Sequence, residues 1–201
     1  SRDLLVALRR VVDRAVGVLG WVAQRLTARG ALRLGAFVGR AAGHLWPSAR
    51  RMTITQVAGA TGFEDSAAVR RLTRVVAERL GENAIEVVRW SHSKPARVEA
   101  EGLGHLDAAL GRGRGAVVAS AHCGPWETLP IALARAGYRV GLVTRPLRDP
   151  AFDMWLGRLR RDGGVRLFPR GTRAEEIAAW LRGGGIVGIV IDQNTRVRTT
   201  E

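Results

Sequence analysis

The sequence has very little cysteine, lysine and tyrosine, and each shortage narrows what the protein can be. Cys123 is the only cysteine among 201 residues, which excludes a disulfide framework and a four-thiolate zinc site and fits a reducing compartment. Lys94 is the only lysine, so the net charge of +14 comes almost wholly from arginine. Guanidinium groups suit phosphates, but the charge alone does not choose between nucleic acid and an anionic membrane surface.

Long uncharged apolar runs are also missing. No stretch of about 18 such residues occurs, which argues against a simple transmembrane span, and no signal-peptide cleavage pattern is present. Apolar residues make up 46% of the chain and charged residues 25%, a balance typical of globular proteins. The length suits one α/β domain or most of one. Because residue 1 is serine and the chain stops shortly after an informative motif, we expect both ends to be truncated.

The first half of the sequence has helical periodicity. Residues 4–22 are apolar except for four charges that fall within an arc of roughly 140° on a helix, and Trp21 lies near the end. Such a helix could lie in a membrane interface or pack on the domain, and the sequence leaves both open. A second helix is predicted over residues 31–46, where Gly35, Gly39 and Gly43 recur every four residues and give a smooth face for close packing.

The remaining part of this half contains a connection and a long helical pattern. Pro47 is predicted to end the second helix, and an arginine-bearing polar connection follows. Residues 66–90 have a helical pattern that we expect to break near Gly81. Residues 1–92 are therefore interpreted as an N-terminal helical, membrane-proximal segment.

From residue 93 onward, short apolar strands alternate with helices of about ten residues. Asp149 and Pro150 are a typical helix start, and Thr172 to Glu175 form a capping-box pattern. Predicted strands cover residues 97–100, 116–121, 139–144, 165–168 and 186–191. This alternation predicts an α/β fold with a mostly parallel sheet flanked by helices over residues 93–201.

Polar residues follow these strands at the points where they end. His122, Arg145 and Asp192 each come directly after a strand, and Arg170 comes two residues after another. Because the carboxyl ends of parallel strands meet at one edge of a sheet, these four side chains are expected to converge there. The sequence therefore predicts a functional site at this edge.

His122 and Glu127 lie at a strand-to-helix turn, in the segment His-Cys-Gly-Pro-Trp-Glu. On one continuous helix, residues five apart point roughly 140° away from each other, so the two side chains can meet only if His122 is still in the turn. A helix that begins near Thr128 would satisfy this condition, and Glu127 could then hold His122 as a general base. The alternative is that Glu127 is only a first-turn acid favoured by the helix dipole, with His122 a structural residue.

These motifs together resemble the lipid A biosynthesis (lauroyl/myristoyl) acyltransferase family, within the lysophospholipid and glycerol-phosphate acyltransferase superfamily. The resemblance covers nearly the whole chain. Its motifs are the lead-in at 98–110, His-x4-Glu at 122–127, Arg145-Pro146, the segment Gly-Arg-Leu-Arg at 157–160, and Asp192-Gln193. The family commonly has asparagine where this chain has Pro125, and its further segment after Asp-Gln is missing here.

The resemblance implies an acyltransferase bound to the cytoplasmic face of a bacterial inner membrane. His122 would take a proton from a glycolipid hydroxyl, which attacks the thioester of an acyl carrier protein or of CoA, and Glu127 would orient the imidazole. Such base catalysis contributes roughly 10²–10⁴-fold. Candidate substrate-binding residues are Arg145, Arg158, Arg170 and Asp192, although ion pairing or helix capping would explain each of them as well. Neither a metal nor a cofactor is expected, and the implied partners are the thioester donor, a lipid A precursor and an anionic membrane surface.

Three alternatives stay open. The acceptor could be another glycolipid, such as a phosphatidylinositol mannoside, because no residue identified here reads the sugar. A basic nucleic-acid-binding domain would suit the charge, but the arginines are spread over every segment and Tyr138 is the only tyrosine, so no aromatic-basic stacking strip is present. Nucleic acid is therefore not expected as a partner. A catalytically dead scaffold of the same fold is the third alternative.

Overall fold

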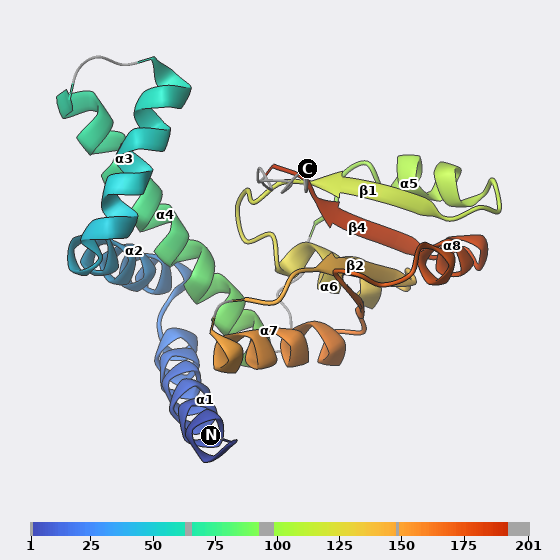
Figure 1. Cartoon of the computed structure of the whole chain (residues 1–201), viewed down its shortest axis with the longest axis horizontal. Helices are drawn as coiled ribbons and strands as arrows, with labels where there is room; N and C mark the ends of the chain where they lie inside the picture. The colour runs from blue at the N-terminus through green and yellow to red at the C-terminus, as the bar shows by residue number, and fades with distance from the viewer. Residues whose placement is uncertain (1, 63–65, 93–98, 148, 193–201) are drawn as a thin grey trace, which may run out of the picture. The chain divides into compact units, whose positions relative to one another are not determined.

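The computed structural model describes residues 2–62, 66–92, 99–147 and 149–192 (Figure 1). The chain divides into two compact units, one formed by residues 15–94 and the other by residues 1–14 together with 95–201. The predicted division into 1–92 and 93–201, with a membrane-proximal first part, stays a prediction. No helix in the described ranges is long and apolar enough to cross a bilayer.

The unit of residues 15–94 is helical. It contains the second part of α1 (Arg2–Arg25), followed by α2 (Ala28–Leu45), α3 (Pro47–Thr61) and α4 (Ser66–His92). Its apolar cluster joins three of these helices, because Ala23, Ala31 and Ile85 are almost fully buried and leucines of α1 and α2 pack around them. Thr27 caps α2 by accepting a hydrogen bond from the backbone N–H of Gly30 at 3.1 Å, which satisfies one of the free donors of the first turn.

The glycine stripe of α2 packs directly against α4, as its spacing predicts. A Cβ atom added to Gly35 would lie only 2.7 Å from the Cα of Glu82, and one added to Gly39 would collide with the carbonyl of Ala77. Gly81 is the matching residue of α4, because a Cβ there would collide with Gly35 and Gly39. The predicted break of the helix at Gly81 is therefore wrong: α4 continues through it, and this glycine permits close contact between backbones.

The predicted polar connection after Pro47 is also wrong, because residues 47–61 form the helix α3. Pro47 occupies the first turn of α3, where a proline lacks only a donor that would be unpaired in any case. It therefore starts a helix directly after ending one. Gly62, with φ 66°, closes α3 in the left-handed conformation.

The second unit contains a four-stranded parallel sheet, in agreement with the predicted fold class. The strands are β1 (Ala116–Ser120), β2 (Val140–Thr144), β3 (Arg166–Pro169) and β4 (Ile186–Val190). Their order across the sheet is β1-β4-β2-β3, so the last strand lies between the first two (Figure 1). Helix α5 (Leu103–Leu110) precedes β1, and the helices that connect the strands are α6 (Thr128–Arg135), α7 (Pro150–Asp162) and α8 (Ala174–Arg182).

Helices cover both faces of the sheet. Val140 and Leu142 of β2 point towards α6 and are both buried. On the opposite face, a Cβ at Gly141 would meet the rings of Phe168 and Trp180, so the absence of a side chain makes room for the edge-on contact between these two rings. The largest fully buried side chains of the unit are Phe168, Ile131, Ile186 and Val187.

The predicted helix starts had mixed outcomes. Asp149 caps α7 as predicted, because its carboxylate accepts from the backbone N–H groups of Ala151 and Phe152 at 2.9 Å each. The capping box at Thr172 is wrong: the Thr172 hydroxyl donates to the carbonyl of Pro169 instead, and α8 begins at Ala174 without a side-chain cap. Half of the strand predicted over residues 97–100 lies outside the described residues, and the other half is wrong, because residues 99 and 100 are not in a strand.

Candidate functional site

The candidate site lies at the carboxyl edge of the sheet, where His122 follows β1 and Asp192 follows β4. These two strands are adjacent and parallel, and Ser120 pairs with Val190 at their ends. The backbone N–H of Ile191 donates to the carbonyl of Ser120 at 3.0 Å, which extends the pairing by one residue. The ladder thus brings together two residues that are 70 positions apart in the sequence.

Asp192 binds His122 through both carboxylate oxygens. Oδ1 lies 2.7 Å from the imidazole Nδ1, and Oδ2 accepts the backbone N–H of His122 at 2.9 Å. The hydrogen bonds from the His122 side chain and backbone lower the pKa of Asp192 below its ordinary value, so this residue is a carboxylate at neutral pH. Because a carboxylate can only accept, Nδ1 carries the hydrogen, and Nε2 of a neutral imidazole keeps a lone pair for a proton.

The turn after β1 holds the imidazole against an aromatic ring. Gly124 has φ 60°, a left-handed conformation that turns the chain towards α6. The ring centroids of His122 and Trp126 lie 5.0 Å apart in an edge-on arrangement. Helix α6 begins at Thr128 as predicted, so Pro130 is its third residue and removes no intrahelical hydrogen bond.

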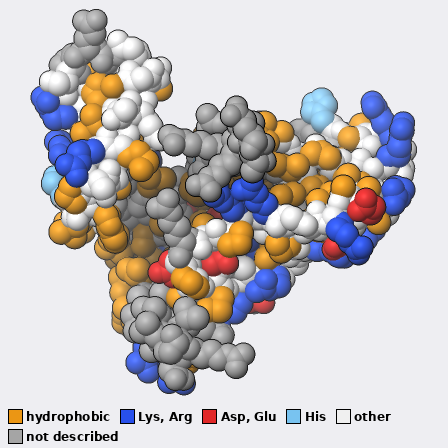
Figure 2. All heavy atoms as spheres, viewed as in Figure 1, with side chains coloured by type: hydrophobic (Ala, Val, Ile, Leu, Met, Phe, Trp, Pro, Cys, Tyr) orange, Lys and Arg blue, Asp and Glu red, His pale blue; other side chains and the backbone are white. Residues whose placement is uncertain are grey.

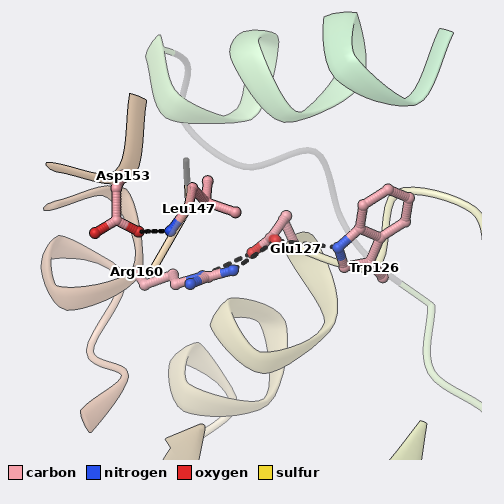
Figure 3. A network of polar contacts seen from close by, with 5 residues as sticks. All are labelled: Trp126, Glu127, Leu147, Asp153 and Arg160. Carbon is pink, nitrogen blue, oxygen red and sulfur yellow. Dashed lines mark hydrogen bonds and ion pairs between the residues drawn. The ribbon is translucent and has the colours of Figure 1, made fainter. Parts of the chain in front are cut away.

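Glu127 binds Arg160 of α7 rather than His122 (Figure 3). Its two oxygens accept from Nε and Nη2 of Arg160 at 2.8 and 2.6 Å, and Oε1 also accepts from the indole N–H of Trp126 at 3.0 Å. Only 12% of the Glu127 side chain and 14% of the Arg160 side chain are exposed. This is a bidentate, mostly buried ion pair, which depends on its geometry for its stability.

The expected direct contact between His122 and Glu127 is therefore wrong. The carboxylate of Glu127 points towards Arg160 of α7, and the carboxylate that holds the imidazole of His122 is that of Asp192. Glu127 is linked to His122 only indirectly in the described contacts: it accepts a hydrogen bond from the indole N–H of Trp126, and the Trp126 ring contacts the imidazole. The catalytic role of Glu127 stays a prediction.

The three predicted arginines have different environments. Arg145 and Arg170 directly follow β2 and β3, so they share the carboxyl edge with His122, and both side chains are exposed. Arg158 lies on α7 and forms an ion pair with Asp13 of α1, with Nη2 and Oδ1 2.5 Å apart. The topology thus brings Arg145 and Arg170 to the carboxyl edge of the sheet, whereas the guanidinium of Arg158 is already paired with the carboxylate of Asp13. The roles of all three in substrate binding stay predictions.

Sequence reasoning missed Arg160, although it lies in the segment 157–160 that carries the resemblance. Arg158 and Arg160 are two positions apart and point about 160° away from each other on a helix. Only one of them can face Glu127, and periodicity alone does not reveal which one does. The loop before α7 is held as well, because the Asp153 carboxylate accepts the backbone N–H of Leu147 at 3.1 Å (Figure 3).

A small cavity lies beside the site, between the sheet and α6. Its volume is about 40 Å³, and its lining is almost wholly apolar, with Trp126, Leu129 and Ile189 among the lining residues. Trp126, the aromatic neighbour of His122, therefore has an apolar space beside it.

Other groups at this site could in principle bind a metal or act as a thiol. Within the described ranges, no group of three or more His, Cys, Asp or Glu side chains could hold a metal ion. Cys123 is a free, exposed thiol next to His122. The chain bends at His122, where the backbone N–H of Cys123 donates to the carbonyl of Ala121 at 2.8 Å. The prediction that Cys123 is not a nucleophile stays a prediction.

Comparison with known proteins agrees with the resemblance. A family model described as bacterial lipid A biosynthesis acyltransferase matches residues 3–200, nearly the whole chain. No curated protein matches the sequence.

Proposed function

The chain belongs to the bacterial lipid A biosynthesis acyltransferase family and is therefore an acyltransferase, and we propose that it acylates a hydroxyl of a lipid A precursor. The donor in this proposal is a fatty acyl thioester of acyl carrier protein or of CoA. The reaction would take place at the cytoplasmic face of the inner membrane, where an amphipathic acceptor is held.

The observation that carries the proposed mechanism is the bond between Nδ1 of His122 and Asp192, at 2.7 Å. In the neutral imidazole this bond places the hydrogen on Nδ1, leaves a lone pair on Nε2 and holds the ring in one orientation, which is the condition for a general base. A partly exposed imidazole, with 30% of its side chain accessible, can still be reached by a hydroxyl group.

The proposed reaction has two steps. The acceptor hydroxyl gives its proton to Nε2 of His122 as its oxygen attacks the thioester carbonyl carbon. In the resulting tetrahedral intermediate the C–S bond breaks, and the departing sulfur takes the proton from the imidazolium. The products are an ester and a free thiol. Asp192 favours this cycle because its negative charge stabilises the imidazolium that forms between the steps.

Charge stabilisation comes from arginine in this proposal. Arg145 and Arg170 would bind the acceptor phosphate or the oxyanion of the intermediate, because they follow β2 and β3 at the same edge as His122. The pair of Glu127 and Arg160 would keep Trp126 against the imidazole through the hydrogen bond to its indole N–H. Glu127 is thus proposed as a positioning residue that acts through Trp126.

The test is acyl transfer measured with purified protein, a radiolabelled acyl thioester and purified acceptors. A radiolabel is preferable to a thiol reagent because Cys123 is exposed and would react as well. His122→Ala should lower the rate of transfer by roughly 10²–10⁴-fold with an unchanged circular dichroism spectrum. Wild-type transfer by this variant would remove the general-base proposal, and transfer to phosphatidylinositol mannoside but not to a lipid A precursor would change the acceptor.

A further inference from the structure

The part of the chain that contains α2 and α3 has an unusual charge distribution. Between residues 14 and 63 there are seven arginines and no aspartate or glutamate. The ion pair that Arg40 forms with Glu78 of α4, at 2.9 Å, is the one described salt bridge that involves this stretch. The stretch therefore presents positive charge that its own sequence does not neutralise, and such a surface attracts anions.

Three strongly exposed apolar residues of this region gather where α2 meets α3, and Phe37 of α2, which is 67% exposed, lies outside that junction. Trp46 alone joins the two helices, since it follows the last residue of α2 and precedes Pro47 of α3. Every residue from 44 to 52 is exposed. We call these nine residues the corner. Leu45, Trp46 and Met52 in the corner are 79%, 66% and 62% exposed.

Two arginines accompany these apolar side chains. Arg50 and Arg51 lie in the first turns of α3, both exposed, and neither forms an ion pair with another residue that the structure describes. No residue of α3 is buried, so this helix presents side chains to its surroundings over its whole length. Figure 2 shows hydrophobic and basic side chains next to one another over α2 and α3.

We propose that the corner docks on the surface of an anionic phospholipid bilayer. Leu45, Trp46 and Met52 enter the boundary between headgroups and acyl chains, and Arg50 and Arg51 bind lipid phosphates. Tryptophan favours this boundary because its ring is apolar and its N–H can still reach water or headgroups. Exposed aliphatic and aromatic side chains next to unpaired arginines match a bilayer surface, which offers hydrocarbon and phosphate together.

The docking surface would hold the enzyme at a membrane. This proposal rests on the proposed function in one respect, namely that the acceptor is a membrane lipid. Duplex nucleic acid fits the corner less well, because phosphates would pair with the arginines while Leu45 and Met52 would gain nothing from the contact. A bilayer offers phosphates to the arginines and hydrocarbon to the apolar side chains. Binding to the membrane and acyl transfer are therefore separable, since the corner contains none of the residues at the sheet edge.

The test uses the whole chain and sedimentation with vesicles of phosphatidylcholine containing 30% phosphatidylglycerol, compared with pure phosphatidylcholine. Wild-type protein should bind the anionic vesicles and lose binding as salt rises. Arg50→Gln with Arg51→Gln should weaken binding by about 30-fold, from the usual contribution of two basic residues near an anionic surface. Leu45→Ser, Trp46→Ser and Met52→Ser together should weaken it at least about tenfold.

Matched controls separate docking from general charge and from catalysis. Arg112→Gln with Arg114→Gln removes the same charge from an exposed turn of the other unit and should leave vesicle binding unchanged. Corner variants should still acylate an acceptor dispersed in detergent, whereas His122→Ala should bind vesicles and not transfer. Three results would overturn the proposal: no binding by the wild type, equal loss in the control, or arginine-dependent binding of duplex DNA without binding to vesicles.

Discussion

Replacing Asp192 by asparagine gives the sharpest test of the proposed mechanism. The carboxylate accepts two hydrogen bonds from His122, one from the backbone N–H at 2.9 Å and one from Nδ1 at 2.7 Å. An amide of the same shape has a single acceptor oxygen. Its oxygen is expected to keep the backbone N–H, because that donor cannot change, and its NH₂ group then faces Nδ1.

The consequence is a change of tautomer. With an N–H donor facing it, Nδ1 must be the acceptor, so the hydrogen moves to Nε2 and the base is lost. The rate of acyl transfer should fall by the whole contribution of base catalysis, roughly 10²–10⁴-fold. Asp192→Ala removes the orientation but imposes no tautomer, so it should be the milder of the two variants.

The assay is transfer of a radiolabelled acyl group, together with thermal unfolding to confirm that the variants are folded. Asp162→Asn is the matched control, because it makes the same change of charge at an exposed position of α7 and should keep wild-type activity. The reasoning would be refuted if Asp192→Asn kept more than about a third of the wild-type rate, or if Asp192→Ala were the more damaging change.

Three other predictions follow from the structure. Arg160→Lys should lower kcat about tenfold or more, because a single ammonium cannot make the bidentate contact with Glu127. An unchanged kcat would show that this contact does not position the residues of the site. Gly39→Ala should lower the unfolding free energy of its helical unit by about 1–3 kcal/mol through overpacking. Gly59→Ala, in open space on α3, should be neutral or stabilising by up to about 1 kcal/mol. Equal effects of the two substitutions in denaturant unfolding would contradict the close packing of α2 and α4. The pKa of Asp192 is lowered in the folded protein by its hydrogen bonds with His122. The carboxylate therefore stabilises the fold above its ordinary pKa of 3.8, and this stabilisation is lost as pH falls through the lower folded value. The difference in unfolding free energy between wild type and Asp192→Asn should thus shrink as pH falls below about 4, as unfolding measured in a pH series would show.

The sheet and its functional edge could be predicted because their signals are local. Short apolar strands alternating with helices indicate a parallel sheet wherever they occur, and the structure contains it. The polar residues that follow the strands therefore had to lie at one edge. Helix starts were predicted correctly where a side chain and a proline agree, as at Asp149 and Pro150, and wrongly at Thr172, where the hydroxyl had another partner within reach.

The two errors in the helical unit have different origins. Gly81 and Pro47 usually interrupt helices, and in an isolated segment each would weaken the helical state. Packing reverses this for Gly81, because only a residue without a side chain lets α4 contact α2 so closely. Pro47 is tolerated because a new helix starts at that position. Packing therefore overrode local preference at Gly81, whereas Pro47 follows the local rule that a proline can begin a helix.

The sequence by itself determined that His122, Arg145, Arg170 and Asp192 lie at the ends of strands, since each side chain follows its strand in the chain. Tertiary structure alone decided which of them meet. The insertion of β4 beside β1 gave His122 the carboxylate of Asp192, and the packing of α7 gave Glu127 the guanidinium of Arg160. Strand order and helix rotation depend on contacts between distant residues, and a local pattern does not contain them.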